Sequence, residues 1–382
     1  MSQDIKQLPT VCFLLGLPRS GTTLLAHLLQ QHPDIAAPPE PWLMLALEAF
    51  GRVDHRHLAG AALIQVATSE FLGRIDRSIV SRAFADAAYG QYLAAAGKRT
   101  FVDKTPRNWL VLEFLDSLYP EAPRILLMRN PYAIAASLKS TWGISLLSAS
   151  CPSAIAACLA GLVMDQPAPA IASSLADIVL GLPTLAAHRG RRQTQVVQYE
   201  LLVARPDEEM RRVIAGLGYE PTAITSAEME QADYLRSSSF GDRKILEKRT
   251  VDERSVQSWQ TELSIEEMQV VTDLVGADLL KEIGYEQDLR YAQQSGVVDK
   301  GREVTEAYRQ LFRTCTELLA GRGAALSGIS AQSSELNTIS RLASDPFIIR
   351  EAQHLAEAKR EENLQLANSI MAQLQQALSA SP

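Results

Sequence analysis

The residues that most constrain the fold lie near the start of the chain, in the sequence Gly-Leu-Pro-Arg-Ser-Gly-Thr-Thr at 16–23. Its two glycines have the spacing of a nucleotide-binding P-loop, in which backbone N–H groups surround a phosphate. Thr22 stands where ATPases and GTPases carry a lysine, while Arg19 offers a cation within the loop. Because γ-phosphoryl transfer depends on that lysine, we expect the loop to hold the phosphate of a different donor.

The flanks of this loop favour a strand followed by a helix. Residues 10–15 form a short apolar run that is typical of a strand buried in a parallel sheet. Residues 22–31 repeat leucine at helical spacing. This order points bare N–H groups and the positive end of a helix dipole at one anion, which argues against a glycine turn that binds nothing.

Further along, strand-like and helix-like segments alternate. Strands are predicted at 100–102, 124–128 and 194–199, and helices at 108–118, 132–140 and 207–217. The pattern predicts an α/β fold with a P-loop-type parallel sheet that has helices on both faces. Because such sheets bind ligands beyond the carboxyl ends of their strands, we expect the loop, Lys104 and Arg129 to converge on one crevice.

Composition narrows the cellular setting. A net charge of −7 argues against nucleic acid and heavily sulfated polymers as partners. The four cysteines are scattered without metal-ligand spacing, as in a reducing compartment. The first predicted strand begins at residue 10, which leaves no room for a signal peptide. We therefore expect a cytoplasmic protein without a transmembrane segment.

One uncharged stretch tests that expectation. Residues 140–164 are long enough to span a bilayer, but they contain glycine, proline and several serines. Buried helices that line a pocket are the better interpretation, with a peripheral contact to a lipid-like substrate as the alternative. Most of the segment falls within residues 142–192, where we expect a helical, acceptor-side part of the catalytic domain.

Several segments together resemble a known family. They are the loop at 16–23, the sequence RILLMRNPYAIAAS at 124–137, VQYELLV at 197–203, and 256–263 with its Trp259. They resemble, in order, the phosphosulfate loop, the 3′-phosphate signature, the Tyr-Glu-Asp-Leu strand and a late tryptophan segment of PAPS-dependent sulfotransferases. PAPS is 3′-phosphoadenosine 5′-phosphosulfate. The resemblance covers roughly residues 9–290, the predicted catalytic domain.

The resemblance implies which residues bind the donor. These are Arg19, Ser20, Gly21, Thr22, Thr23, Arg129, Ser137 and Tyr199. Sulfonate transfer from PAPS involves no triphosphate, so neither the P-loop lysine nor a metal ion is required. The transfer does need cations where charge develops on the leaving phosphate, and Arg19 and Lys104 are the candidates.

The acceptor hydroxyl must also lose a proton to a general base. Glu40, in the sequence Pro-Pro-Glu-Pro, occupies the place where protein-tyrosine sulfotransferases with the same loop carry a glutamate base. Its proline neighbours differ from that group, which puts tyrosyl-protein specificity in doubt. Cytosolic small-molecule sulfotransferases use a histidine instead, so His55 and His57 are alternatives.

Other segments are less specific. The basic cluster at 188–192 fits a solvated loop better than an anion site, and residues 236–239 and 244–254 are candidates for a loop over the nucleotide. Residues 291–382 form a C-terminal helical extension with amphipathic repeats at 304–319 and 352–378. It could pack on the catalytic domain, form a homodimer or dock onto a partner.

The sequence thus predicts a sulfotransferase that acts on a small-molecule, sugar or peptide hydroxyl. An atypical P-loop nucleotide or nucleoside kinase is one alternative, weakened by Thr22. A catalytically inactive nucleotide-binding scaffold that works through its C-terminal helices is another.

Overall fold

The computed structural model describes residues 8–50, 61–144, 170–220 and 254–319. The chain divides into two compact units, and each is described by itself. The sheet unit comprises residues 1–129 and 187–253, and the helical unit comprises residues 130–186 and 254–382. The predicted division at residue 290 stays a prediction.

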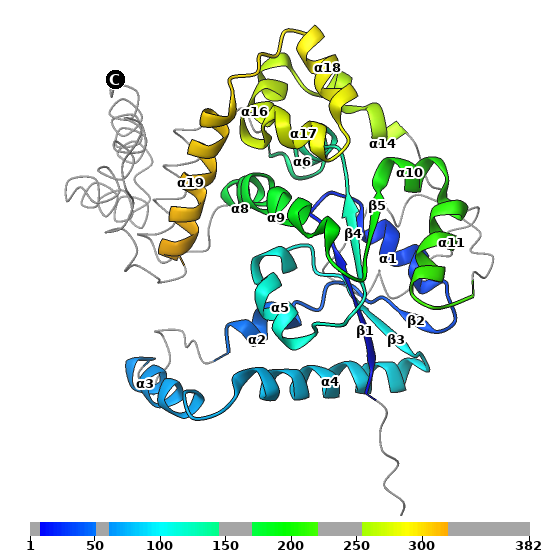
Figure 1. Cartoon of the computed structure of the whole chain (residues 1–382), viewed down its shortest axis with the longest axis vertical. Coiled ribbons are helices and arrows are strands. Elements are labelled where there is room, and N and C mark those ends of the chain that lie inside the picture. Colours follow the sequence, from blue (N-terminus) through cyan, green and yellow to red (C-terminus); the bar gives the residue numbers. More distant parts are fainter. Residues whose placement is uncertain (1–7, 51–60, 145–169, 221–253, 320–382) are drawn as a thin grey trace, which may run out of the picture. The chain divides into compact units, whose positions relative to one another are not determined.

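The sheet unit is built on a five-stranded parallel sheet with the order β2-β3-β1-β4-β5 (Figure 1). Its strands are β1 (Thr10–Leu15), β2 (Ile35–Ala36), β3 (Thr100–Asp103), β4 (Arg124–Met128) and β5 (Thr194–Gln198). The three central strands are buried almost throughout, because helices cover both faces of the sheet. The strands predicted at 10–15, 100–102 and 124–128 are confirmed.

Helices connect these strands. They are α1 (Thr22–Gln30), α2 (Leu43–Glu48), α3 (Ala61–Leu72), α4 (Arg77–Ala96), α5 (Leu112–Leu118), α10 (Tyr199–Ala204) and α11 (Pro206–Gly216), with 3₁₀ turns at Asn108–Val111 and His188–Gly190. In Figure 1, α1 and α11 lie on one side of the strands and α5 lies on the other. The predicted α/β fold is thus confirmed.

The strand predicted at 194–199 is confirmed as β5, which ends one residue earlier, at Gln198. The resemblance of 197–203 to a strand of the family holds only for its first two residues, because α10 begins at Tyr199. Leu202 and Val203 of this helix are buried while Leu201 is exposed, as the helical period requires. The short apolar run therefore fits a helix turn as well as a strand.

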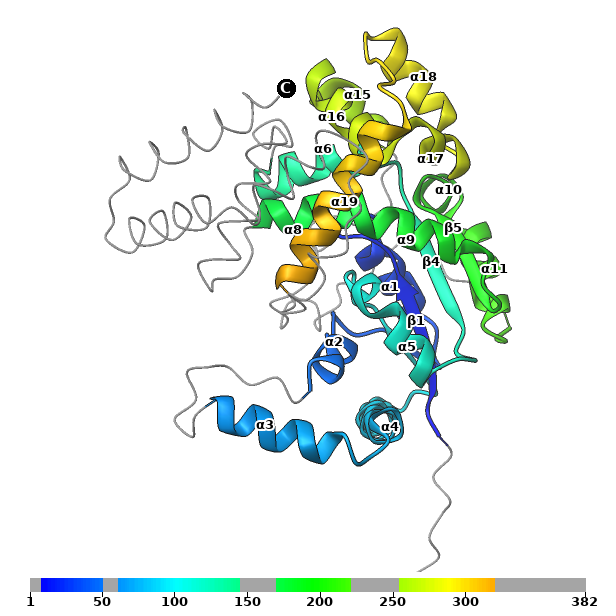
Figure 2. The same ribbon diagram turned by 60° about the vertical axis from the view of Figure 1, so that its left-hand side comes forward.

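The helical unit contains α6 (Pro131–Trp142), α8 (Ala170–Ala176), a π-helical turn (Asp177–Gly181), α9 (Leu182–Ala187), α14 (Arg254–Gln257), α15 (Trp259–Glu262), α16 (Ile265–Val275), α17 (Ala277–Glu282), α18 (Glu286–Gln294) and α19 (Arg302–Leu319). Trp259 is completely buried and stacks on Tyr132 at 4.8 Å between ring centroids. The helix predicted from 304 is confirmed by α19, which runs beside α16 (Figure 2). The repeat at 352–378 lies outside the described residues. Within the part of the chain that is described, no helix is long and apolar enough to cross a bilayer.

Candidate active site

Every strand of the sheet is followed by a segment that carries a predicted site residue. The loop 16–23 follows β1, and Glu40 lies shortly after β2. Lys104, Arg129 and Tyr199 come directly after β3, β4 and β5. Because all five strands are parallel, these segments leave the sheet at the same edge, which we call the carboxyl edge.

The loop 16–23 is wound tightly around its own backbone. The carbonyl of Leu17 accepts hydrogen bonds from the Ser20 amide at 3.1 Å and the Ser20 hydroxyl at 2.7 Å. Arg19 and Gly21 both have left-handed backbones, with φ values of 66° and 98°. Gly21 immediately precedes α1 and has no side chain to occupy the first-turn N–H groups. Those groups and the helix dipole are suited to an anion.

Packing explains why the two loop positions must be glycine. A Cβ on Gly21 would lie 2.4 Å from the Tyr199 ring, and one on Gly16 would lie 2.7 Å from the Thr22 methyl group. The same Cβ on Gly16 would lie 3.1 Å from the Leu127 carbonyl of β4. The glycines therefore allow the loop to approach β4 and α10, and the cradle that results is lined by backbone, as a phosphate site requires.

Arg129 joins the ends of three strands. Its Nη1 donates a 2.7 Å hydrogen bond to the carbonyl of Arg19, in the loop after β1. Its guanidinium carbon lies 4.2 Å from the ring centroid of Tyr199, the first residue after β5. Both side chains are buried. Arg129 thus contacts both Arg19 and Tyr199, two other residues that the family resemblance predicted to bind the donor.

The predicted base and the predicted cation form an ion pair. Lys104 Nζ lies 3.1 Å from Glu40 Oε1, and the lysine side chain is only 1% exposed. The second carboxylate oxygen, Oε2, accepts a 3.3 Å hydrogen bond from the indole Nε1 of Trp42. Sequence reasoning singled out Glu40 and Lys104 but predicted neither their contact nor the part played by Trp42.

A buried carboxylate, that of Asp103, precedes Lys104 in the chain and anchors the residues around this pair by hydrogen bonds. Asp103, the last residue of β3, is completely buried and accepts hydrogen bonds from Tyr89 at 2.6 Å and Thr105 at 2.9 Å. Thr105 Oγ1 in turn accepts the backbone N–H of Trp42 at 3.2 Å. Burial raises the pKa of Asp103, and it also raises the pKa of Tyr89. A polar residue at the end of a buried strand was the only sequence signal for this network.

Other predicted site residues belong to the helical unit or lie outside the described residues. Ser137 is half-buried on α6, in the helical unit. His55, His57, residues 236–239 and most of 244–254 lie outside the described residues. Among the side chains that are described, no three His, Cys, Asp or Glu residues form a group suited to a metal ion.

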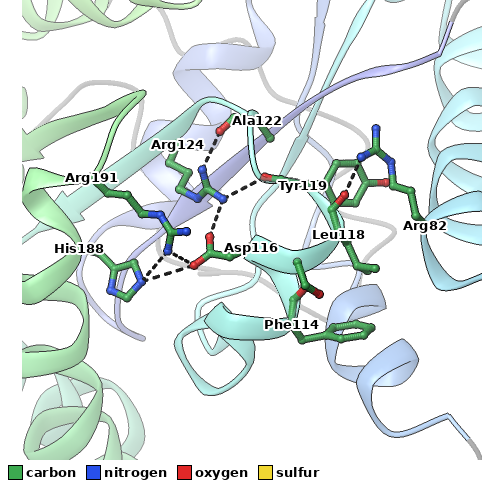
Figure 3. A network of polar contacts seen from close by, with 10 residues as sticks. Arg82, Phe114, Asp116, Leu118, Tyr119, Ala122, Arg124, His188 and Arg191 are labelled. Carbon is green, nitrogen blue, oxygen red and sulfur yellow. Dashed lines mark hydrogen bonds and ion pairs between the residues drawn. The ribbon is translucent and has the colours of Figure 1, made fainter. Parts of the chain in front are cut away.

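The basic cluster at 188–192 lies at the opposite, amino edge of the sheet, just before β5 (Figure 3). Arg191 forms an ion pair with Asp116 of α5, and His188 Nε2 lies 3.8 Å from the same carboxylate. Asp116 also accepts a 2.6 Å hydrogen bond from the completely buried Arg124 of β4. Arg191 and Arg192 are exposed, as expected for a solvated loop. His188 and Arg191 also pair with an acid that sequence spacing did not connect to them.

Comparison with known proteins identifies the family of this chain. Residues 11–223 match the profile of the sulfotransferase family. The chain belongs to this family of enzymes, and membership implies PAPS as the donor, which favours the predicted sulfotransferase over a kinase.

The chain is also similar to individual proteins. The chain is 65% identical over 388 residues to the nodulation protein NoeE of Sinorhizobium fredii (strain NBRC 101917 / NGR234), covering 100% of this chain and 92% of that protein. A solved sulfotransferase domain from the curacin biosynthetic pathway is 19% identical, with a TM-score of 0.45 over 70% of this chain and 97% of that one. The sulfotransferase domain of the Synechococcus PCC 7002 olefin synthase is 23% identical, with a TM-score of 0.42 over 71% of this chain and 96% of that one.

Proposed function

We propose that this enzyme transfers the sulfonate group of PAPS in line to a hydroxyl acceptor, with Glu40 as general base and without a metal ion. The observation that carries the proposal is the Glu40–Lys104 ion pair at the carboxyl edge, which unites a proton acceptor and a buried cation. The backbone cradle of the loop 16–23 fits the 5′-phosphosulfate end of the donor. Arg129, together with Ser137, would bind the 3′-phosphate.

In the proposed reaction Glu40 takes the proton of the acceptor hydroxyl as its oxygen bonds to sulfur. The bond between sulfur and the oxygen of the 5′-phosphate breaks, and negative charge develops on that phosphate. Arg19, Lys104 and the N–H groups at the start of α1 stabilise this charge. Lys104 is well suited to the task, because a buried ammonium group acts with little screening by water.

The acceptor class is inferred from nodulation, the process for which the relative NoeE is named, and from the residues around Glu40. We infer that this enzyme, like its relative, takes part in nodulation and works in the cytoplasm on a hydroxyl of a small molecule or sugar. The prolines on either side of Glu40 disfavour a tyrosyl peptide. An acceptor screen should therefore yield sulfated sugars or small alcohols, whereas preferential sulfation of tyrosine peptides would contradict this part of the proposal.

The donor site is tested by calorimetric titration with adenosine 3′,5′-bisphosphate in the presence of EDTA, beside a titration with Mg-ATP. We expect tight binding of the bisphosphate, unaffected by EDTA and weakened in Arg129→Ala. Arg191→Ala, at the amino edge, is the matched control and should bind like the wild type. Binding of Mg-ATP alone, or of the bisphosphate only with a metal ion, would contradict the proposal.

The base is tested by Glu40→Gln, which keeps the shape of the side chain but cannot take a proton. We expect the bisphosphate affinity to be retained while turnover falls by about 10²-fold or more. Unchanged turnover would assign the role to a histidine, and His55→Gln and His57→Gln would then be compared.

A further inference from the structure

We propose that Trp42 is a positioning residue that fixes the Glu40 carboxylate for proton transfer, an inference that rests on the proposed role of Glu40 as base. The two oxygens of this carboxylate have different partners. Oε1 contacts the Lys104 ammonium at 3.1 Å, and Oε2 accepts the Trp42 indole N–H at 3.3 Å. One donor is charged and on a flexible side chain, whereas the other is neutral and on a rigid ring.

The backbone of Trp42 supports a function for its side chain. The residue is left-handed, with φ 55° and ψ 15°, a conformation that favours glycine or asparagine over a bulky residue. Strained positions of this kind persist only where their surroundings hold them, and they cluster at functional sites. Here the Trp42 amide is held by Thr105 Oγ1, and Thr105 is held by the buried Asp103.

This arrangement couples the base to the end of β3. Lys104 belongs to the same turn as Asp103 and Thr105, so the base and the cation are both placed by one strand end. The chain from Asp103 through Thr105 to Trp42 sets the direction of the indole N–H, which in turn sets the plane of the Glu40 carboxylate. Rotation of that carboxylate would require this contact to break.

In the proposed reaction Lys104 and Trp42, the two partners of the Glu40 carboxylate, have separate roles. If the Lys104 ammonium turns toward the transferring sulfonate, Oε1 becomes available for the acceptor proton. During that exchange the Trp42 N–H keeps Oε2 in place, so the carboxylate does not turn with the lysine. An indole N–H suits this role because it donates only and does not ionise at neutral pH.

The test is Trp42→Phe, which keeps an aromatic ring and removes the N–H. We expect kcat to fall about tenfold, because one hydrogen bond to a charged group is lost. The KM for PAPS and the affinity for adenosine 3′,5′-bisphosphate should change less than about twofold, since the donor site does not involve Trp42. The acid limb of the pH–kcat profile should move to higher pH, because a carboxylate that loses a donor is protonated more easily.

Two comparisons separate this role from a structural one. Trp259→Phe removes a buried indole whose Nε1 has no hydrogen-bond partner among the described residues, and it should leave the pH profile in place. Thr105→Val removes the acceptor of the Trp42 amide and should lower kcat in the same direction, while Thr105→Ser should restore most of it. The Thr105 pair also tests the inference if Trp42→Phe does not fold.

A double-mutant cycle with Glu40→Gln decides whether Trp42 acts through the base. We expect Trp42→Phe to have no further effect on the residual turnover of Glu40→Gln. An equal tenfold loss in both backgrounds, or wild-type kcat in Trp42→Phe, would overturn the inference and leave Glu40 as the base. Full activity of Glu40→Gln alone would instead overturn the proposed role of Glu40 as base, on which this inference rests.

Discussion

The two edges of the sheet carry the same kinds of charged side chain, but these side chains serve different purposes. At the amino edge, Asp116 binds Arg124 and Arg191, and Arg124 also donates to the carbonyls of Ala122 and Tyr119. At the carboxyl edge, Glu40 and Lys104 pair across two loops, and Arg129 lies on Tyr199 beside the loop 16–23. The first network ties a helix to the starts of two strands, whereas the second gathers charge where a ligand would enter.

The comparison shows that a buried ion pair does not reveal its purpose by itself. Its place on the fold does, because parallel sheets bind ligands at the carboxyl ends of their strands. We therefore expect substitutions at that edge to lower activity and substitutions at the amino edge to lower stability.

The largest expected effect is that of Lys104→Met, which keeps the length of the side chain and removes its charge. Turnover should fall by about 10³-fold, because the variant loses a cation aimed at the developing charge. The matched control is Lys98→Met at the other end of β3, where Lys98 Nζ donates to the His32 carbonyl. Steady-state kinetics and thermal unfolding of both variants check the prediction, and a Lys104→Met enzyme within threefold of wild-type kcat would break the comparison.

Asp116→Asn should lower the stability of the protein and leave its turnover unchanged, which is the opposite of the effect of Lys104→Met. We expect the free energy of unfolding to fall by about 3 kcal/mol, because the completely buried Arg124 loses its counter-ion. The kcat of the folded enzyme should stay unchanged. Urea unfolding measures the first quantity, with Glu113→Gln on the exposed side of α5 as control. A lower kcat at unaltered stability would mean that the amino edge also serves the reaction.

Sequence patterns predicted the parts of this molecule that depend on neighbours in the chain. The run 10–15 and the glycine spacing of 16–23 specify a buried strand and a glycine loop that leads into a helix by local rules, and both are found. Lys104 and Arg129 were each predicted to follow a strand directly. This alone placed both residues at the carboxyl edge, although no contact of either residue was predicted. The two-residue strand β2 was missed because it is too short to have a period.

Contacts between distant segments could not be predicted. Glu40 and Lys104 are 64 residues apart, and Asp116 and Arg191 are 75 apart, so no spacing rule connects them. The sequence likewise gave no reason to place a left-handed backbone at Trp42, since turns of that kind favour glycine and asparagine. The roles of Glu40, Ser137 and Tyr199 stay predictions.

A smaller effect is expected from substitution of Tyr199, whose ring contacts the Arg129 guanidinium. Tyr199→Leu should weaken adenosine 3′,5′-bisphosphate binding about fivefold, because the cation–π contact at 4.2 Å is lost. Tyr199→Phe keeps the ring and should bind like the wild type. Calorimetry distinguishes the two, and equal losses in both variants would assign the effect to the phenolic hydroxyl instead of the ring.

The smallest effect is expected at Cys12, a free cysteine buried in β1. Burial raises the pKa of this thiol to about 12, although nearby Arg124 lowers it in part. Between pH 7 and 9 an exposed thiol becomes largely ionised, with a pKa of about 8.5, whereas folded Cys12 stays protonated. Iodoacetamide should therefore not label Cys12 at pH 7 or at pH 9. Mass spectrometry of the treated protein checks this prediction.

The same pKa affects stability in a defined direction. Because the unfolded chain releases the thiol proton at lower pH than the folded chain, the contribution of Cys12 to stability is complete below about pH 8.5 and is lost as the pH rises toward 12. Asp116→Asn should expose Cys12 to labelling by raising the unfolded fraction, and Lys104→Met should not. Equal labelling of Cys12 in these two variants would remove the distinction between the edges.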